Sequence, residues 1–269
     1  MLKHRYVVVD LCVLEAGRLS SYILDEDHVV LPHMIMSDLA GRKAAAMREH
    51  AEHLPEWLRA RGDQVWIARD WATLEDLESS PDIRIEGLGW RDDEGSKKLR
   101  LGKDATPKQW LDSFKDFESP TGRQIVEDGR KAFLGSCGRI ENAMMENHPV
   151  IVCQVKSSQC WRTEVARLVK EPIMGHILGL VGDRKYHTQE WNDALERFPD
   201  EMAFGRTSRI LCWYSLAQAA GKRKVESNDF EDAAYAHAAS YTGYLATEDR
   251  DLIDMVRAVF ENVTIIPKQ

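Results

Sequence analysis

Four aspartates near the two ends of the chain stand where a carboxylate could take part in catalysis. Asp10 ends the apolar run RYVVVD, and Asp249 follows the short apolar run at 244–247. Asp38 and Asp232 each belong to a segment with a helical pattern that lies beside an apolar run. Because ligands and catalytic groups collect at the carboxyl ends of parallel strands, these four side chains are expected to share one acidic pocket. Pockets of carboxylate oxygens usually hold Mg²⁺ or Mn²⁺.

Electrostatics favours a cation in such a pocket. Four converging carboxylates repel one another and raise each other's pKa, and a divalent cation removes that penalty. Any single Asp is more often a helix cap or a solvated surface residue, so the prediction depends on all four lying at one sheet edge.

Short apolar runs predict the strands that position these acids. The runs lie at 5–9, 28–31, 65–68, 244–247 and 263–266, and helical patterns separate them. Strands that alternate with helices predict an α/β fold with a parallel central sheet flanked by helices.

Two helices of this fold have recognisable first turns. Pro32 is expected to open the helix that carries Asp38, since proline is tolerated in a first helical turn. Thr207 or Ser208 is expected to cap a helix whose apolar residues continue to about position 217.

The segment around Asp232 is the clearest helix in the sequence. Asn228 and Glu231 have capping-box spacing, which predicts a helix over 229–242 that ends at Gly243. The alanines of this segment recur at helical spacing and would let its backbone approach a sheet closely. Asp232 would then lie near the strand ends without bulky neighbours to cover it.

The middle of the chain, from 81 to 199, has a less regular pattern. We predict that it is an inserted, mostly helical subdomain between the two parts of the core, 1–80 and 200–269. Within it, the sequence predicts a charged loop at 91–98 and a strand at 149–155.

Composition bounds the class of protein. The chain has 269 residues, of which 43% are hydrophobic, and no apolar run approaches the length of a membrane span, so neither a membrane helix nor a secretory signal is expected. Its five scattered cysteines form no CxxC pair, which argues against a disulfide framework or a structural zinc site and favours a reducing cytoplasm. The net charge of −8 argues against a protein coated in basic surface for duplex DNA, so any nucleic-acid contact should be local.

Four basic residues are candidates for such a local contact. Lys97 and Lys98 belong to a basic run, and Arg206 and Arg209 lie on the helix that leads into the Asp232 segment. All four could contact the phosphates of a nucleic acid. The alternative for the two lysines is a solvated loop that balances the acids beside it.

Three segments of the sequence resemble the PIN-domain nucleases. They are VVVD with Asp10, LPHMIMSDL with Asp38, and EDAAYAHAASYTGYLATEDRDL with Asp232 and Asp249. The last segment is the most specific, because it joins an aspartate, an alanine-rich helix, a glycine, an apolar strand and a Thr-x-Asp motif. The resemblance covers about residues 5–41 and 205–267.

This resemblance implies a divalent-metal-dependent endoribonuclease with a PIN-like core, which hydrolyses phosphodiester bonds. In this chemistry a bound cation lowers the pKa of a coordinated water, and no nucleophilic side chain is needed. The sequence agrees, because it contains no convincing Ser–His or Cys–His arrangement. The four aspartates named above would be its metal ligands for Mg²⁺ or Mn²⁺, with Asp251 as an additional ligand and Thr247 orienting the metal or its water. Many proteins of this family are toxins of toxin–antitoxin pairs, so a role as a toxin or anti-phage effector is expected, with an antitoxin or effector-complex protein as a partner. Homo-oligomer formation is compatible with the resemblance.

The sequence also departs from the family pattern, and the departures leave alternatives open. Leu11 and Cys12 follow Asp10 where the family usually places Ser or Thr and then Asn, and Asp38 stands where Glu is common. A PIN-like protein without catalysis that serves as a protein or RNA interaction module is therefore one alternative. A PIN-like DNA nuclease is another, because an acidic metal site contacts the phosphate, which RNA and DNA share, and not the sugar. An aspartate phosphotransferase of the haloacid-dehalogenase type ranks lower, because its Asp-x-Asp motif would need an acid at position 12.

Overall fold

The computed structural model describes residues 4–14, 19–34, 61–84, 89–101, 109, 120–170 and 184–268. Within them a six-stranded sheet has the order β4-β3-β2-β1-β5-β6, and every pair of neighbours is parallel except β3 and β4. The strands are β1 (Tyr6–Val9), β2 (His28–Pro32), β3 (Val65–Ala68), β4 (Arg91–Asp92), β5 (Tyr244–Ala246) and β6 (Thr264–Ile265). The predicted α/β class with a mainly parallel sheet is confirmed.

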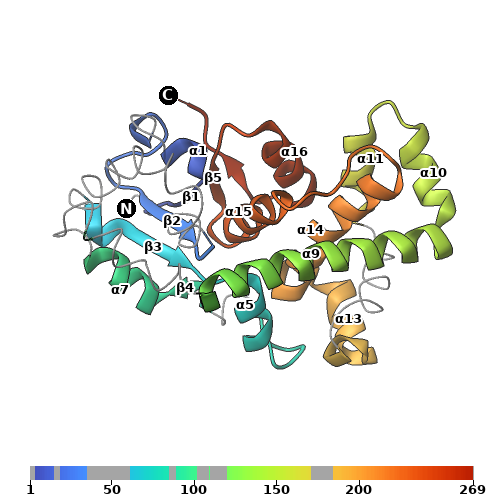
Figure 1. The fold of residues 1–269 in the computed structure, drawn as a ribbon, viewed down its shortest axis with the longest axis horizontal. Helices are drawn as coiled ribbons and strands as arrows, with labels where there is room; N and C mark the ends of the chain where they lie inside the picture. Colours follow the sequence, from blue (N-terminus) through green and yellow to red (C-terminus); the bar gives the residue numbers. More distant parts are fainter. Residues whose placement is uncertain are drawn as a thin grey trace.

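Helices account for most of the remaining described chain. The α-helices are α1 (Leu11–Leu14), α5 (Trp71–Leu77), α7 (Asp93–Leu101), α9 (Pro120–Asn147), α10 (Pro149–Ser157), α11 (Trp161–Leu168), α13 (Gln189–Arg197), α14 (Ala203–Ala219), α15 (Asp229–Thr242) and α16 (Arg250–Val259). Short 3-10 turns lie at Leu19–Ser21, Gly62–Gln64, Arg184–His187 and Pro199–Glu201. Figure 1 shows the sheet at one end of the molecule, with α9 running away from it towards α10 and α11 at the other end.

The central strands form because their residues are buried on both faces. Val7, Val8 and Val9 of β1 and the Val29–Leu31 stretch of β2 have no solvent exposure. β-branched side chains suit a pleated strand, and a parallel sheet covered by helices takes continuous apolar runs. The α15 helix packs against β1 and β2, with its alanines Ala236 and Ala239 completely buried.

The order of the strands creates a crevice beside β1. From β1 the chain builds β2 and then β3 on one side, and it returns much later to place β5 on the other side of β1. The strand order therefore reverses at β1. In open α/β sheets the ligand site lies at such a reversal, outside the carboxyl ends of the strands.

The segment predicted as a charged loop at 91–98 instead forms β4 and most of α7. The Asp92 carboxylate accepts a hydrogen bond from the Gly95 N–H at 2.9 Å, which starts the helix. The Ser96 hydroxyl accepts from the Ile67 N–H at 2.9 Å, and Leu99 is completely buried. These contacts hold α7 against β3, so part of the span predicted as an insertion extends the sheet.

The segment predicted as a strand at 149–155 is the helix α10. Proline occupies its first turn, where the missing N–H has no partner to lose. Val152 and Val155 are buried three residues apart, whereas Val150 is 77% exposed. That is a helical period, and a short apolar run does not distinguish it from a strand.

Pro32 ends β2 instead of starting a helix. It pairs with Ala68 of β3 in the parallel ladder. The helix that we predicted after Pro32 lies outside the described residues.

The α14 helix begins earlier than predicted and is capped from a distance. Thr207 and Ser208, the predicted caps, are buried inside the helix. The carboxylate of Glu78 instead accepts hydrogen bonds from the N–H groups of Ala203 at 2.7 Å and Phe204 at 3.1 Å. Glu78 is completely buried, so a charged group holds the start of α14 to the end of α5.

The α15 helix has the predicted bounds but not the predicted capping box. Asn228 makes no side-chain capping bond, and Glu231 is paired with Arg130 of α9. The helix ends at Gly243, whose φ of 79° is left-handed and favours glycine, as predicted.

None of the described helices is both long and apolar enough to cross a membrane.

Replacing Glu78 with Ala is expected to lower the free energy of unfolding by about 2–4 kcal/mol. The change leaves two buried N–H groups without their charged acceptor, and hydrogen bonds to charged groups are the stronger kind. Urea unfolding followed by circular dichroism measures the loss. Asp76→Ala, at an exposed position of the same helix α5, should change stability by less than about 0.5 kcal/mol. Equal stability of the two variants would contradict the capping role.

Candidate functional site

Asp10 and Thr247 lie side by side at the carboxyl ends of β1 and β5. The strand register pairs Val9 with Ala246, and the Asp10 N–H donates to the Ala246 carbonyl at 3.0 Å. The Thr247 hydroxyl then donates to Oδ2 of Asp10 at 2.6 Å. Both side chains are nearly buried, with Asp10 only 8% exposed. Two residues 237 positions apart in the sequence thus form one hydrogen-bonded pair in the crevice beside β1.

Cys12 is a third member of this group that the sequence did not predict. Its thiol donates to the same Oδ2 of Asp10 at 3.0 Å. Burial raises the pKa of this thiol to about 12, and the charge of Asp10 and the hydrogen bond to it act in the same direction. The thiol is therefore protonated at neutral pH and is a donor, not a nucleophile. Its signal in the sequence is its position two residues after the strand-end acid.

Asp249 is joined to the same group through its backbone. Its N–H donates to the Thr247 hydroxyl oxygen at 3.0 Å. Its Oδ1 caps α16, accepting from the N–H groups of Asp251 at 2.8 Å and Leu252 at 3.1 Å. The part of the chain that the structure describes provides no hydrogen bond to Oδ2 of Asp249. Asp249 therefore caps α16 with Oδ1, and its Oδ2 is available to bind a ligand.

Asp232 lies in the first turn of α15 and is influenced by the other acids. Burial raises its pKa to about 7, and the charges of Asp249, Asp10 and Asp229 add to the increase, while Arg223 opposes it. Among the described residues, no hydrogen bond or ion pair reaches the Asp232 carboxylate. The structure therefore places Asp232 within electrostatic range of Asp10 and Asp249, whereas Asp38 lies outside the described residues.

Tyr235 fixes α15 over the end of β1, and the sequence did not single it out. The Leu11 N–H donates to the Tyr235 hydroxyl at 3.1 Å. Tyr235 follows Asp232 by three residues, which places both on the same side of the helix. The contact therefore holds the first turn of α15 near the Asp10 carboxylate.

Asp251, predicted as an additional ligand, is directed elsewhere. Its carboxylate is exposed and pairs with Arg162 at 3.0 Å, and the same guanidinium contacts Asp254 at 3.1 Å. Its contribution to the acidic group is its backbone N–H, which donates to Asp249. The prediction of a ligand at this position is not supported by the structure.

Arg206, predicted to contact RNA, is buried between α14 and α15. Its Nε donates to the Asp200 carbonyl at 2.7 Å, and its Nη1 donates to the carbonyl and the hydroxyl of Ser240. Its guanidinium lies 4.8 Å from the Tyr241 ring centroid. Arg209 is ion-paired with Asp200. Arg206 therefore joins the two helices and is not presented to a phosphate.

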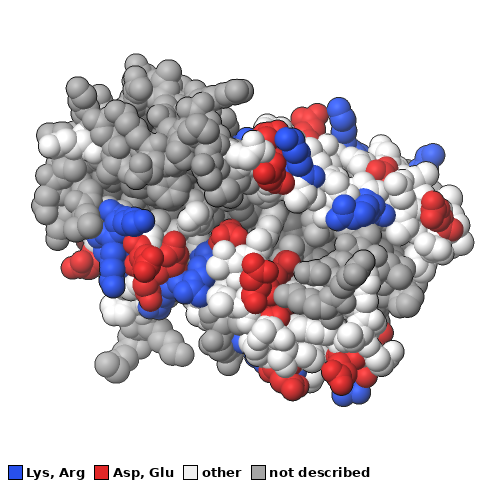
Figure 2. All heavy atoms as spheres, turned by 60° about the horizontal axis from the view of Figure 1, so that its bottom comes forward, with Lys and Arg blue, Asp and Glu red and all other residues white. Residues whose placement is uncertain are grey.

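Lys97 and Lys98 are exposed, but they lie away from the acidic group. They belong to α7, which packs on β3, and β2 separates β3 from β1. Figure 2 shows acidic and basic side chains interspersed over the described part of the face in view. These two lysines remain a prediction for an outlying contact with RNA.

The acidic group suits a hard divalent cation in its donors and its charge. Asp10, Asp232 and Asp249 offer carboxylate oxygens, the donors that Mg²⁺ and Mn²⁺ take. Burial raises the pKa of Asp232, and the negative charges of Asp249 and Asp10 raise it further, so a cation would be favoured beside them. Within the described ranges, no three His, Cys, Asp or Glu side chains are grouped tightly enough to hold a metal ion as they stand. The donor atoms of these residues fit a cation chemically.

Comparisons with known proteins do not assign the chain to a family. No protein-family model matches it, and no curated protein and no solved structure gives a significant match. A function must therefore be inferred from the site itself.

Asp232→Asn is expected to stabilise the metal-free protein at alkaline pH. A carboxyl group with a pKa near 7 when folded and about 4 when unfolded binds more protons in the folded state. Its contribution to stability is complete below pH 4 and is lost as the pH rises through 7. At pH 8 in EDTA the Asn variant should be more stable by roughly 2–4 kcal/mol, since one pKa unit corresponds to about 1.4 kcal/mol.

Urea unfolding at pH 4 and pH 8 measures this effect. The two proteins should have equal stability at pH 4, and Asp76→Asn, at an exposed site, should show no difference at either pH. A variant that is less stable than the native chain at pH 8 would show that Asp232 is not a strained carboxylate.

Proposed function

We propose that this protein is a divalent-metal-dependent endoribonuclease with a PIN-like core. The observation that carries the proposal is the convergence of Asp10, Asp232 and Asp249 at the crevice beside β1. Asp10 comes from β1, Asp249 from the end of β5, and Asp232 from the helix above them. Structural carboxylates are usually paired with a cation or fully hydrogen-bonded. Within the described part of the chain, the Asp232 carboxylate has neither an ion pair nor a hydrogen bond.

Each residue of the group has a distinct part in holding a cation. Asp10 and Asp249 each have one carboxylate oxygen without a described hydrogen bond, and these oxygens would bind it together with Asp232 and Asp38. Thr247 orients Asp10 through its hydroxyl and Asp249 through its backbone, so it positions two ligands at once. A divalent cation bound there would lower the pKa of a coordinated water and stabilise negative charge on the scissile phosphate.

The protonation of Asp232 bears on metal binding. Burial and the neighbouring acids raise the pKa of this carboxyl to about 7 in the metal-free protein. A divalent cation favours the charged carboxylate, so its binding would release the proton and leave Asp232 as a ligand.

The biological setting that we propose is that of a toxin or an anti-phage effector, with an antitoxin or effector-complex protein as its partner. This setting follows from the resemblance to PIN-domain nucleases, which favours RNA over DNA. The DNA-cleaving alternative shares the same residues, so RNA and DNA substrates have to be compared directly.

The purified protein is expected to cleave single-stranded RNA in Mg²⁺ or Mn²⁺ and to be inactive in excess EDTA. Asp10→Asn and Asp232→Asn should each lower the cleavage rate by about 100-fold or more, because each replaces a charged carboxylate ligand of the cation with a neutral amide. Thr247→Val should lower it by about tenfold, since the ligands stay but lose their orientation. Gel analysis of labelled RNA and of DNA of the same sequence measures the rates.

Circular dichroism of each variant provides the control for folding. Undiminished cleavage by both Asp variants, or in excess chelator, would refute the proposed function.

A PIN-like interaction module without catalysis is the second candidate. The observation in its favour is that Cys12 and Thr247 both donate to one oxygen of Asp10, which satisfies that oxygen without a metal. Calorimetric titration with Mn²⁺ separates the two candidates. The nuclease predicts binding that Asp10→Asn weakens at least about tenfold, whereas a folded native chain that binds no Mn²⁺ would favour the interaction module.

A further inference from the structure

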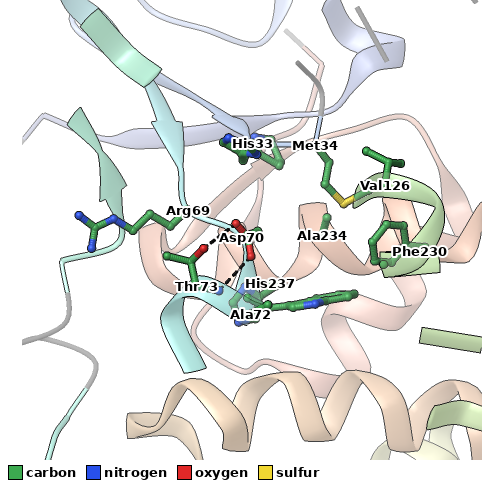
Figure 3. Close-up of a pocket in the computed structure, with 13 residues that line it drawn as sticks. His33, Met34, Arg69, Asp70, Ala72, Thr73, Val126, Phe230, Ala234 and His237 are labelled. Carbon is green, nitrogen blue, oxygen red and sulfur yellow. Dashed lines mark hydrogen bonds between the residues drawn. The ribbon is translucent and has the colours of Figure 1, made fainter. Parts of the chain in front are cut away.

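A cavity of about 370 Å³ opens at the carboxyl ends of β2 and β3. Its walls come from these strand ends, from the first turn of α5, from α9 and from α15, as Figure 3 shows. Small-molecule sites have volumes of about 300–1,000 Å³ and mainly apolar walls with a few polar groups. The cavity has these properties, and the acidic group does not account for it.

Aromatic rings form the walls of the cavity and hold one another in place. Trp71 and Phe230 meet edge to face with ring centroids 5.2 Å apart, and Trp71 also stacks near Phe133 at 6.1 Å. The His237 ring lies edge-on to Trp71 at 6.1 Å, and burial lowers its pKa to about 3, so it is neutral. Gly129 of α9 closes the wall, since a Cβ there would come within 2.8 Å of the Phe230 ring. The rings are therefore set before any ligand enters.

One carboxylate lies on the lining and can distinguish ligands. Asp70 caps α5 by accepting from the Thr73 N–H at 2.9 Å and from the Thr73 hydroxyl at 2.8 Å, one bond to each oxygen. Each carboxylate oxygen has a second lone pair, so Asp70 can accept from a ligand as well. In Figure 3 the guanidinium of Arg69 is turned away from the cavity. The described lining thus offers aromatic rings and an acceptor, which suits a base with an amino group better than a phosphate.

The cavity and the acidic group lie on opposite flanks of α15. Phe230 and Ala234 line the cavity, and Asp232 lies between them in the sequence. Two residues correspond to about 200° around a helix, so Phe230 and Ala234 face away from Asp232. Both sites are near the first turns of α15 at the carboxyl edge of the sheet, separated by about one helix width of 10 Å. A nucleic-acid strand that crosses the start of α15 would reach both.

We propose that this cavity binds a nucleobase of the RNA strand whose scissile phosphate lies at the acidic group. The inference deepens the proposed function and depends on it for the position of the phosphate. Stacking between the base and the aromatic walls supplies affinity, and Asp70 favours bases with an exocyclic amino group. The base belongs to a nucleotide near the cleaved bond, on the far side of α15 from Asp232.

Filling the cavity tests the proposal by RNA binding. Ala234→Leu places a larger side chain in the cavity, and fluorescein-labelled octamers of A, C and U, read by anisotropy in EDTA, are the probes. Ala234→Leu should weaken binding of the A octamer by about tenfold, as expected for the loss of one stacked base. Gln124→Leu, a matched substitution at an exposed site of α9, should change it less than about twofold. An octamer of abasic nucleotides should bind the native chain and Ala234→Leu equally.

Changing Asp70 to Asn tests the base preference without removing the helix cap, because Asn caps helices as well as Asp. The native chain should bind the A and C octamers more tightly than the U octamer. The amide of Asn can donate as well as accept, so Asp70→Asn should reduce this preference at least threefold. Thermal unfolding of each variant confirms that the fold is kept.

The outcomes separate this inference from the proposed function. If the protein cleaves RNA and Ala234→Leu, folded, binds the A octamer as tightly as the native chain does, the base pocket is refuted and the nuclease stands. If no cleavage occurs under any metal condition but Ala234→Leu still weakens binding tenfold, the nuclease is refuted and the base pocket stands.

Discussion

The pairing of β1 with β5 is the interaction on which the candidate site depends. These two strands come from opposite ends of the chain, and their parallel register puts Asp10 next to Thr247. The single hydroxyl of Thr247 then donates to Asp10 and accepts from the N–H of Asp249, so it links the ends of both strands. A shift of the register by one residue would turn Asp10 to the other face of the sheet and separate the pair. The burial of the valines of β1 makes such a shift costly.

The α15 helix turns this sheet edge into two sites. One flank holds Asp232 beside the strand-end acids, and the other carries Phe230 and Ala234 into the aromatic cavity. Tyr235 holds the helix down on the end of β1, and the buried alanines behind it allow the close approach. The helix thereby keeps a partly buried carboxylate near like charges, an arrangement that lowers stability in the absence of a cation. Functional sites commonly retain such local strain.

Features that depend on neighbouring residues could be predicted from the sequence, whereas features that depend on contacts between distant residues could not. The five parallel strands and the proximity of Asp10 to Thr247 were predictable, because buried β-branched runs and strand-end positions are local features, whereas β4 lies in a segment predicted as a charged loop. The run at 149–155 was misassigned, because its helical period shows only when it packs against α9. Arg206 was misassigned as an RNA contact because its partner Ser240 lies 34 residues away, and burial of a cation leaves no mark in the sequence. The aromatic cavity combines five elements, so composition alone could not reveal it.

The most direct measurement of the central claim is the position of bound manganese in crystals of the full chain. Anomalous scattering at the manganese edge locates the ion independently of its effect on activity. Our account predicts a peak within about 2.5 Å of carboxylate oxygens of Asp10 and Asp232, close to Thr247 and Asp249. Well-ordered crystals in saturating Mn²⁺ with no peak at this edge of the sheet, or with a peak only elsewhere, would contradict it.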